Sequence, residues 1–416
     1  MLLIKNCIVV SEVGERNVDV KIKDGMIEKV DNVISDANGY KLLDAKGLYL
    51  LPSIIDLNIR ILDDTFNMPN LKKLYESMKK GGVGSFVLSP RFFPLVENQT
   101  FMQLLGFELN KNYQQLVPAI KALKNIELTK LNDIATLSKY GINIIQENSN
   151  INGNLIRRIM QYAKMNDSIF FTFCQNQDLN DSGVMNEGEV SFKLGIPGIS
   201  KIGEISEVAK MVQFSQYYRV KTHFQALSTK EALDIVHIAK EKFKSISSEV
   251  SIHHLILDDT YCDDYNTYAK INPPLRENSQ KEALLTALKE GKIDTITSLH
   301  SPKSVLFKDV AFAEAMFGID VIEDFMALCY TYLVKDGVIS LYELTKLISL
   351  NPAKILGFEK VGVVEEGYEA NFMIFNPNSL KTIENLQTPY SGKIIHGSVE
   401  TIINKGEIEI SYQNVI

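Results

Sequence analysis

The stretch Leu48–Asp64, LYLLPSIIDLNIRILDD, decides the fold of this chain. Within it, Ile54–Ile61 is an apolar run, rich in β-branched residues, that begins just after a proline. Such a run is typical of a strand buried on both faces, as in a parallel sheet or barrel covered by helices. Because barrels carry their chemistry at the C-terminal ends of their strands, the alternating residues Asp56, Asn58 and Arg60 are the first candidates for a site.

Apolar segments alternate with helical ones from residue 53 to about residue 357, which is the pattern of a βα-type fold. The predicted strands are Ile54–Ile61, Gly84–Leu88, Leu116–Ile120, Ile142–Ile145, Ser168–Phe173, Val220–Phe224, Val250–His254 and Ile293–Leu299. Capping boxes at Ser228–Glu231 and Ser279–Glu282 predict where two of the helices begin. Eight strands alternating with helices over about 300 residues predict a (β/α)8 barrel of the TIM type.

Both ends of the chain are patterned as short strands without helices. The predicted terminal strands are Leu2–Val10, Val18–Lys23, Met26–Val30, Gly362–Val364, Asn371–Phe375 and Val399–Ile410. We therefore predict two domains in this α/β protein: a small β-sandwich made by residues 1–52 and 358–416 together, and the barrel, residues 53–357.

The composition of the 416 residues is that of a globular protein, with 45% hydrophobic and 23% charged residues. A net charge of −7 without a long Lys/Arg block argues against nucleic acid or a membrane as partner. Four scattered cysteines, Cys7, Cys174, Cys262 and Cys329, predict free buried thiols in a reducing compartment. No targeting or membrane-spanning pattern is present, so we expect a cytoplasmic protein.

Several segments resemble, in the expected order, the dihydroorotase branch of the amidohydrolase superfamily. The first is the opening stretch, which is similar to that family's first barrel strand, LPGFIDLHVH. The others are Gly183–Ser191 with Leu194–Gly198, Ile271–Arg276 (INPPLR), Ala315–Gly318 and Asn351–Gly357. The resemblance covers nearly the whole chain. It implies the barrel fold, a place in pyrimidine biosynthesis and, in active members, C–N hydrolysis of a cyclic amide or ureide.

The resemblance fails at the positions where the family holds zinc. Those ligands are two histidines on strand one, a carboxylate or carbamylated lysine on strand four, histidines on strands five and six, and an aspartate on strand eight. The corresponding residues here are Asn58, Arg60, Glu147 or Asn148, Phe173, Ala226 and Leu299. Because phenylalanine, alanine and leucine carry no ligand atom, we expect zinc to be absent and these positions to be non-catalytic.

The substrate positions are altered as well. Arg91 stands where the family has an asparagine, whereas Asn272 and His300 match positions that contact substrate in active relatives. Together with Arg60 they define a candidate vestigial pocket. We further expect Arg60 to pair with Glu147 or Asp56, so that a guanidinium occupies the space of the ion; the alternative is that Arg60 extends into solvent.

The remaining histidines allow two interpretations. His223, His253, His254 and His300 could form a relocated metal site, or they could be packing histidines with satisfied hydrogen bonds. We favour the second interpretation, because a zinc site needs a correlated set of ligands.

The sequence thus predicts a non-catalytic, dihydroorotase-like protein. By family analogy it would be a structural or regulatory partner of aspartate carbamoyltransferase, and a homo-oligomer. The alternative is an active dihydroorotase, or a related cyclic amidohydrolase, with an atypical metal site. The simultaneous loss of ligands from strands one, five, six and eight favours the non-catalytic reading.

Overall fold

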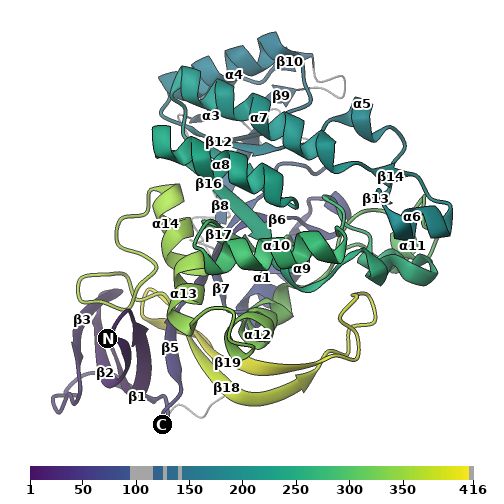
Figure 1. Ribbon diagram of the computed structural model, residues 1–416. Coiled ribbons are helices and arrows are strands. Elements are labelled where there is room, and N and C mark those ends of the chain that lie inside the picture. Colours follow the sequence, from purple (N-terminus) through teal and green to yellow (C-terminus); the bar gives the residue numbers. More distant parts are fainter. Residues whose placement is uncertain (94–115, 125–128, 139–142, 412–416) are drawn as a thin grey trace.

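The computed structural model describes residues 1–93, 116–124, 129–138 and 143–411, and it contains a barrel beside a β domain (Figure 1). The strands of the barrel are β6 (Ile54–Ile59), β7 (Val83–Leu88), β8 (Leu116–Lys121), β11 (Ile144–Asn148), β12 (Ile169–Phe173), β15 (Thr222–Gln225), β16 (Ile246–Ser251) and β17 (Thr295–Thr297). They pair in parallel and in chain order. The amide of Arg60 donates to the carbonyl of His300 (2.8 Å), which joins the first strand to the last. The predicted barrel is confirmed.

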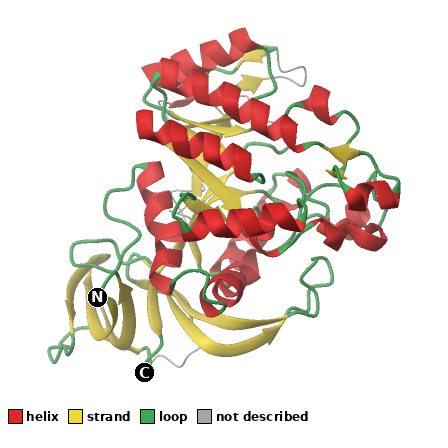
Figure 2. Cartoon of the chain, viewed as in Figure 1, coloured by secondary structure: helices red, strands yellow, loops and turns green. Residues whose placement is uncertain are grey.

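Helices cover the outside of this sheet (Figure 2). The long ones are α1 (Met68–Lys80), α4 (Gly153–Met165), α7 (Lys201–Tyr218), α8 (Lys230–Lys242) and α10 (Asn278–Lys289). The short ones are α3 (Ile134–Ser138), α5 (Gln177–Asn180), α6 (Glu189–Leu194), α9 (Ile252–Ile256), α11 (Val305–Lys308), α12 (Phe325–Cys329), α13 (Leu341–Thr345) and α14 (Asn351–Leu356). In α1 the buried residues Leu71, Leu74, Tyr75 and Met78 follow the helical period, so one stripe faces the sheet.

Shorter elements complete the barrel's loops. There are two small strand pairs, β9 (Leu123–Lys124) with β10 (Lys130–Leu131) and β13 (Met185–Asn186) with β14 (Gly198–Ile199). The 3-10 segments are Leu62–Asp64, Asp259–Tyr265, Thr267–Ala269 and Ile322–Asp324, and the π-helical segments are Tyr330–Lys335 and Lys346–Leu350.

The strands from both ends of the chain share one sheet. They are β1 (Leu2–Ser11), β2 (Gly14–Lys23), β3 (Met26–Asp31), β4 (Lys41–Asp44), β5 (Tyr49–Pro52), β18 (Phe372–Thr382), β19 (Ile394–Asn404) and β20 (Glu407–Ser411). Their order is β20-β19-β18-β5-β1-β2-β3, with β4 beside β1. Because β5 pairs antiparallel with β18, the two termini build this domain jointly. It has its own apolar core, which includes Ile4, Val20 and Phe372.

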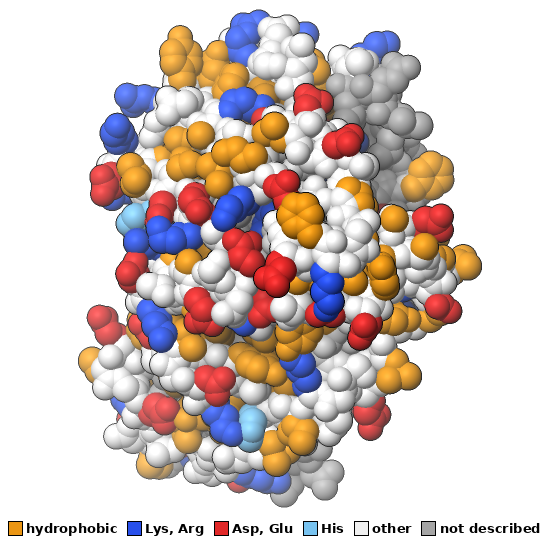
Figure 3. All heavy atoms as spheres, turned by 45° about the vertical axis from the view of Figure 1, so that its right-hand side comes forward, with side chains coloured by type: hydrophobic (Ala, Val, Ile, Leu, Met, Phe, Trp, Pro, Cys, Tyr) orange, Lys and Arg blue, Asp and Glu red, His pale blue; other side chains and the backbone are white. Residues whose placement is uncertain are grey.

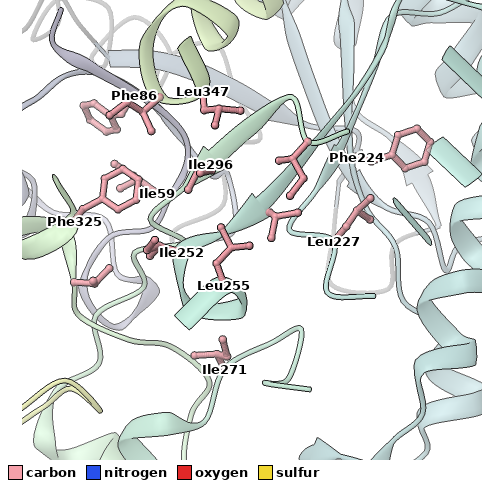
Figure 4. Packing of buried hydrophobic residues seen from close by; sticks show 14 of the residues in the cluster. Ile59, Phe86, Phe224, Leu227, Ile252, Leu255, Ile271, Ile296, Phe325 and Leu347 are labelled. Carbon is pink, nitrogen blue, oxygen red and sulfur yellow. The ribbon is translucent and has the colours of Figure 1, made fainter. Parts of the chain in front are cut away.

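The barrel is packed as a core and not as a channel. The interior of the barrel, toward the amino ends of its strands, is filled by an apolar cluster that includes Leu57, Val87 and Phe171. Ala353 of α14 also belongs to that cluster. A larger cluster lies between the strands and the helices, and Figure 4 shows part of it. This apolar filling leaves only the upper ends of the strands for polar chemistry.

Four local predictions are wrong. The seventh strand is Ile246–Ser251, and the helix α9 follows at once because the Ser251 hydroxyl caps it by accepting from the amide of His254 (3.4 Å). Helix α8 is capped by Thr229 and not by Ser228, and α10 begins after Glu277. The segment Gly362–Val364 forms no strand. Residue 142 of the fourth predicted strand lies outside the described residues.

The surface and the cysteines agree with the composition. Acidic and basic side chains are interspersed over the face shown in Figure 3. All four cysteines are buried and free. In the described ranges no helix is both long and apolar enough to cross a bilayer.

Candidate functional site

The positions at which the related family binds zinc lie at the carboxyl ends of the barrel strands. We call this end of the barrel the barrel mouth. Asn58 is in β6 and Arg60 follows it, Glu147 is in β11, and Phe173 ends β12. Ala226 comes directly after β15 and Leu299 two residues after β17. The structure thus brings to one end of the barrel the positions that the sequence comparison identified.

A buried carboxylate that the sequence analysis missed occupies this end. Glu249 of β16 accepts a hydrogen bond from the Asn58 side-chain amide (2.7 Å) and from the Ala226 backbone N–H (3.1 Å). Its second oxygen lies 3.1 Å from Nε2 of His223. Glu249 and His223 are both fully buried. The sequence does contain a signal for it, a lone acidic residue within the strand Ile246–Ser251. The predicted seventh strand began four residues too late, at Val250, and therefore excluded Glu249.

We expect Glu249→Ala to lower the free energy of unfolding by about 3 kcal/mol, because buried donors lose their acceptor. Glu249→Gln keeps one acceptor oxygen and should cost clearly less. Urea unfolding of the wild type and of both variants measures the difference. Equal stability of the alanine and glutamine variants would contradict this description of the site.

The predicted pairing of Arg60 with Glu147 or Asp56 is wrong, because both carboxylates are bonded elsewhere. Glu147 accepts from the backbone amides of Leu123 (3.2 Å) and Asn148 (3.0 Å). Asp56 accepts from the Thr297 hydroxyl (2.5 Å) and from the backbone amide of Ser298 (3.0 Å). Each carboxylate is thus satisfied by donors of its own neighbourhood.

Arg60 instead lies beside Asp64, four residues further along the chain. Its Nη1 is 3.9 Å from Oδ2 of Asp64, which is too far for a hydrogen bond. That oxygen is taken by the buried ammonium of Lys303 (2.6 Å). The Arg60 side chain keeps 26% of its surface exposed, so it is partly in contact with solvent.

A second guanidinium, that of Arg91, occupies the mouth. It donates to the side-chain oxygen of Asn148 and lies over the ring of Phe173, 5.1 Å from the ring centre. Burial, followed by the neighbouring positive charge of Arg60, lowers the pKa of Arg91 to about 9. Asn148 and Phe173, which stand at ligand positions of the family on strands four and five, therefore contact a positively charged side chain of the protein itself.

The other two residues of the candidate vestigial pocket are held elsewhere. Nδ1 of His300 accepts from the backbone amides of Val321 and Ile322 (3.3 Å each), and burial lowers its pKa. The Asn272 amide donates to Gln175 (2.9 Å), while its buried oxygen has no partner among the described residues. Among these residues no hydrogen bond or ion pair links either side chain to the two arginines.

His253 and His254 lie in α9 and are bonded within the fold. Nδ1 of His253 lies 2.8 Å from the hydroxyl of Tyr390. Nδ1 of His254 lies 2.7 Å from the Ser251 hydroxyl, and its Nε2 donates to the carbonyls of Pro273 and Pro274 (3.2 Å each). These contacts are those of packing histidines, although the buried Nε2 of His253 has no partner among the described residues.

Two of the altered positions retain a strained backbone. Ala226 has φ +49° and Leu299 has φ +50°, both in the left-handed region. A residue with a side chain there costs roughly 1–2 kcal/mol, and such strain gathers at functional sites. Two positions of the barrel mouth thus hold a strained backbone.

The side chains of the mouth do not fit the zinc ion that the family resemblance implies. A catalytic zinc needs three protein ligands from His, Asp, Glu or Cys. Within the described ranges no three such side chains are grouped closely enough to hold a metal. Phe173, Ala226 and Leu299 have no donor atom, and Arg60 and Arg91 place positive charge where a cation would lie.

Comparison with known proteins gives the following matches. A profile described as "Amidohydrolase family" matches residues 198–408. The dihydroorotase of Ruminiclostridium cellulolyticum is 31% identical over 97% of this chain and 97% of its own length. That of Caldanaerobacter subterraneus is 29% identical over 98% of this chain and 96% of its own.

Solved structures share the fold at low identity. The L-hydantoinase (dihydropyrimidinase) of Arthrobacter aurescens superposes with a TM-score of 0.85 at 17% identity, over 100% of this chain and 97% of that one. The dihydropyrimidinase of Brevibacillus agri gives 0.83 at 19%, over 100% and 96%.

Proposed function

We propose that this chain, which belongs to the amidohydrolase family, is a dihydroorotase-like protein that does not catalyse hydrolysis. The observation that carries the proposal is the content of the barrel mouth. Three ligand positions are apolar, at Phe173, Ala226 and Leu299, and two arginines stand beside them.

The polar side chains around Glu249 are hydrogen-bonded to one another. Hydrolysis of a cyclic amide needs a polarised carbonyl and an activated water, which a metal supplies in this family. Here Glu249 is bonded to Asn58, His223 and the Ala226 amide, so its two oxygens stabilise the fold. Arg60 and Arg91 can only donate hydrogen bonds and cannot accept a proton, because guanidinium groups stay protonated at neutral pH. Neither arginine can therefore act as a general base.

We expect the purified protein to carry far less than one zinc ion per chain and to convert no dihydroorotate above the buffer rate. Metal analysis by mass spectrometry and a dihydroorotate assay in both directions measure this, with the R. cellulolyticum dihydroorotase prepared in parallel as a positive control. One bound zinc per chain together with turnover would overturn the proposal.

A second candidate function is an active dihydroorotase, or a related cyclic amidohydrolase, with an atypical metal site. The names of the relatives favour it: both are called dihydroorotase, both match along nearly the whole chain, and neither is described as non-catalytic. The side chains of the mouth favour the first candidate. Extending the assay to hydantoin and dihydrouracil tests the wider class, because the structural neighbours are named for those activities.

The proposal extends to the protein's place in the cell. We infer a cytoplasmic, homo-oligomeric subunit of pyrimidine biosynthesis that associates with aspartate carbamoyltransferase as a structural or regulatory partner. Support comes from the family resemblance alone. Sizing chromatography of the two purified proteins at micromolar concentration should give one shared peak. Two separate peaks at every ratio would overturn the partner.

A further inference from the structure

A hollow of about 360 Å³ lies at the amino ends of the barrel strands, on the side opposite to the mouth. It is bordered by the first residues of β12, β15 and β16, by the end of α8 and by α14; β12, β16, α8 and α14 are labelled in Figure 1. We call it the basal pocket. Its size is that of pockets which bind small molecules.

The charge of the basal pocket is opposite to that of the whole chain. Four lysines line it, Lys221, Lys240, Lys244 and Lys354, with the single carboxylate of Asp294, whereas the chain carries −7 overall. Such a local excess of one sign attracts counter-charged ligands.

Two of these lysines are neutralised and two are not. Lys240 pairs with Asp294, and Lys221 lies 3.0 Å from Asp167, outside the pocket. The second oxygen of Asp294 accepts from the backbone amide of Ser248 (2.9 Å), so that carboxylate is fully used. Among the described residues no carboxylate lies within 4.0 Å of the ammonium of Lys244 or Lys354. The pocket thus holds two ammonium groups without a counter-ion.

Other lining groups suit an anion with an apolar body. Ser245 and Ser247 bring hydroxyl groups to the lining, and Ile169, Ile246 and Ile355 bring apolar side chains. Ammonium and hydroxyl groups are common ligands of phosphate, and a phosphate monoester carries about −1.5 to −2 charges at neutral pH. Two free lysines match that charge.

We propose that the basal pocket binds a small phosphorylated metabolite, with the phosphate between Lys244 and Lys354 and the apolar part against the isoleucines. This site is independent of any chemistry at the mouth. Ser247 also connects it to the mouth: its hydroxyl lies 2.9 Å from Nδ1 of His223, whose other nitrogen reaches Glu249.

Calorimetric titration of the full chain with inorganic pyrophosphate, at low salt, tests the proposal. We expect saturable binding to the wild type, and binding weaker by about tenfold or more in the double variant Lys244→Ala/Lys354→Ala, because both charges facing the anion are removed. Lys244 and Lys354 are both exposed, so the double variant should fold normally.

The matched control is Lys72→Ala/Lys73→Ala, which removes the same charge from the exposed face of α1. It should bind pyrophosphate like the wild type. Absence of saturable binding to the wild type, or equal weakening in both double variants, would overturn the proposal.

Discussion

Replacing Glu204 with alanine should lower the free energy of unfolding by about 4 kcal/mol, because its carboxylate satisfies several buried donors at once. Glu204 lies in α7 and is 4% exposed. It accepts from the backbone amides of Ser228 (3.0 Å) and Thr229 (2.9 Å) and from both hydroxyls (2.6 and 2.7 Å). A guanidinium nitrogen of the buried Arg276 lies 4.0 Å away.

The alanine variant leaves each of these donors without water or an acceptor, and it leaves the charge of Arg276 without its nearest buried carboxylate. Denaturant unfolding monitored by circular dichroism measures the loss. The control is Glu241→Ala, at an exposed position of α8, which should change stability by about 0.5 kcal/mol or less. A Glu204→Ala variant as stable as that control would contradict the assignment.

The same network holds together segments that carry the family resemblance. Arg276, in the segment Ile271–Arg276, donates to the Ser228 hydroxyl (3.0 Å), to the side chain of Asn186 (3.1 Å) and to the carbonyl of Ile199 (2.8 Å). It therefore joins two of the segments on which the family resemblance rests. These residues are needed by the scaffold whatever happens at the mouth.

Acidification from pH 6.5 to pH 5 should lower the free energy of unfolding by roughly 3 kcal/mol through His253 and His254. Burial is the main cause that lowers the pKa of His253 to about 3 and that of His254 to about 4. In the unfolded chain both titrate near 6.5. Between pH 6.5 and pH 4 the unfolded state therefore binds more protons, so stability falls as the pH falls.

Unfolding curves at pH 6.5 and pH 5 measure this dependence. The variants His253→Gln and His254→Gln each remove one titrating group and should each reduce the difference between the two pH values by about 1.5 kcal/mol. His237→Gln, on the partly exposed surface of α8, is the control and should leave the difference unchanged. An identical pH dependence in the wild type and in the α9 variants would contradict the prediction.

The sequence by itself determined the architecture and the lack of metal-ligand atoms at three positions of the barrel mouth. Apolar periodicity is a local property, so it predicted the eight-stranded barrel and the strand-rich termini before any contact was known, although it placed the seventh strand four residues too late. The absence of donor atoms at Phe173, Ala226 and Leu299 is likewise independent of the fold, because no conformation gives those side chains a metal ligand.

Only the tertiary structure decided which charged groups meet. Arg60 lies beside Asp64 and not beside the carboxylates expected for it, and Asn58 bonds to Glu249, which is 191 positions away in the chain. The basal pocket likewise collects lysines from the residue before β15, from α8 and the segment after it, and from α14. Such pairings depend on where distant strand ends and helix ends converge, and the strength of an electrostatic contact depends on distances and burial that composition and spacing do not contain.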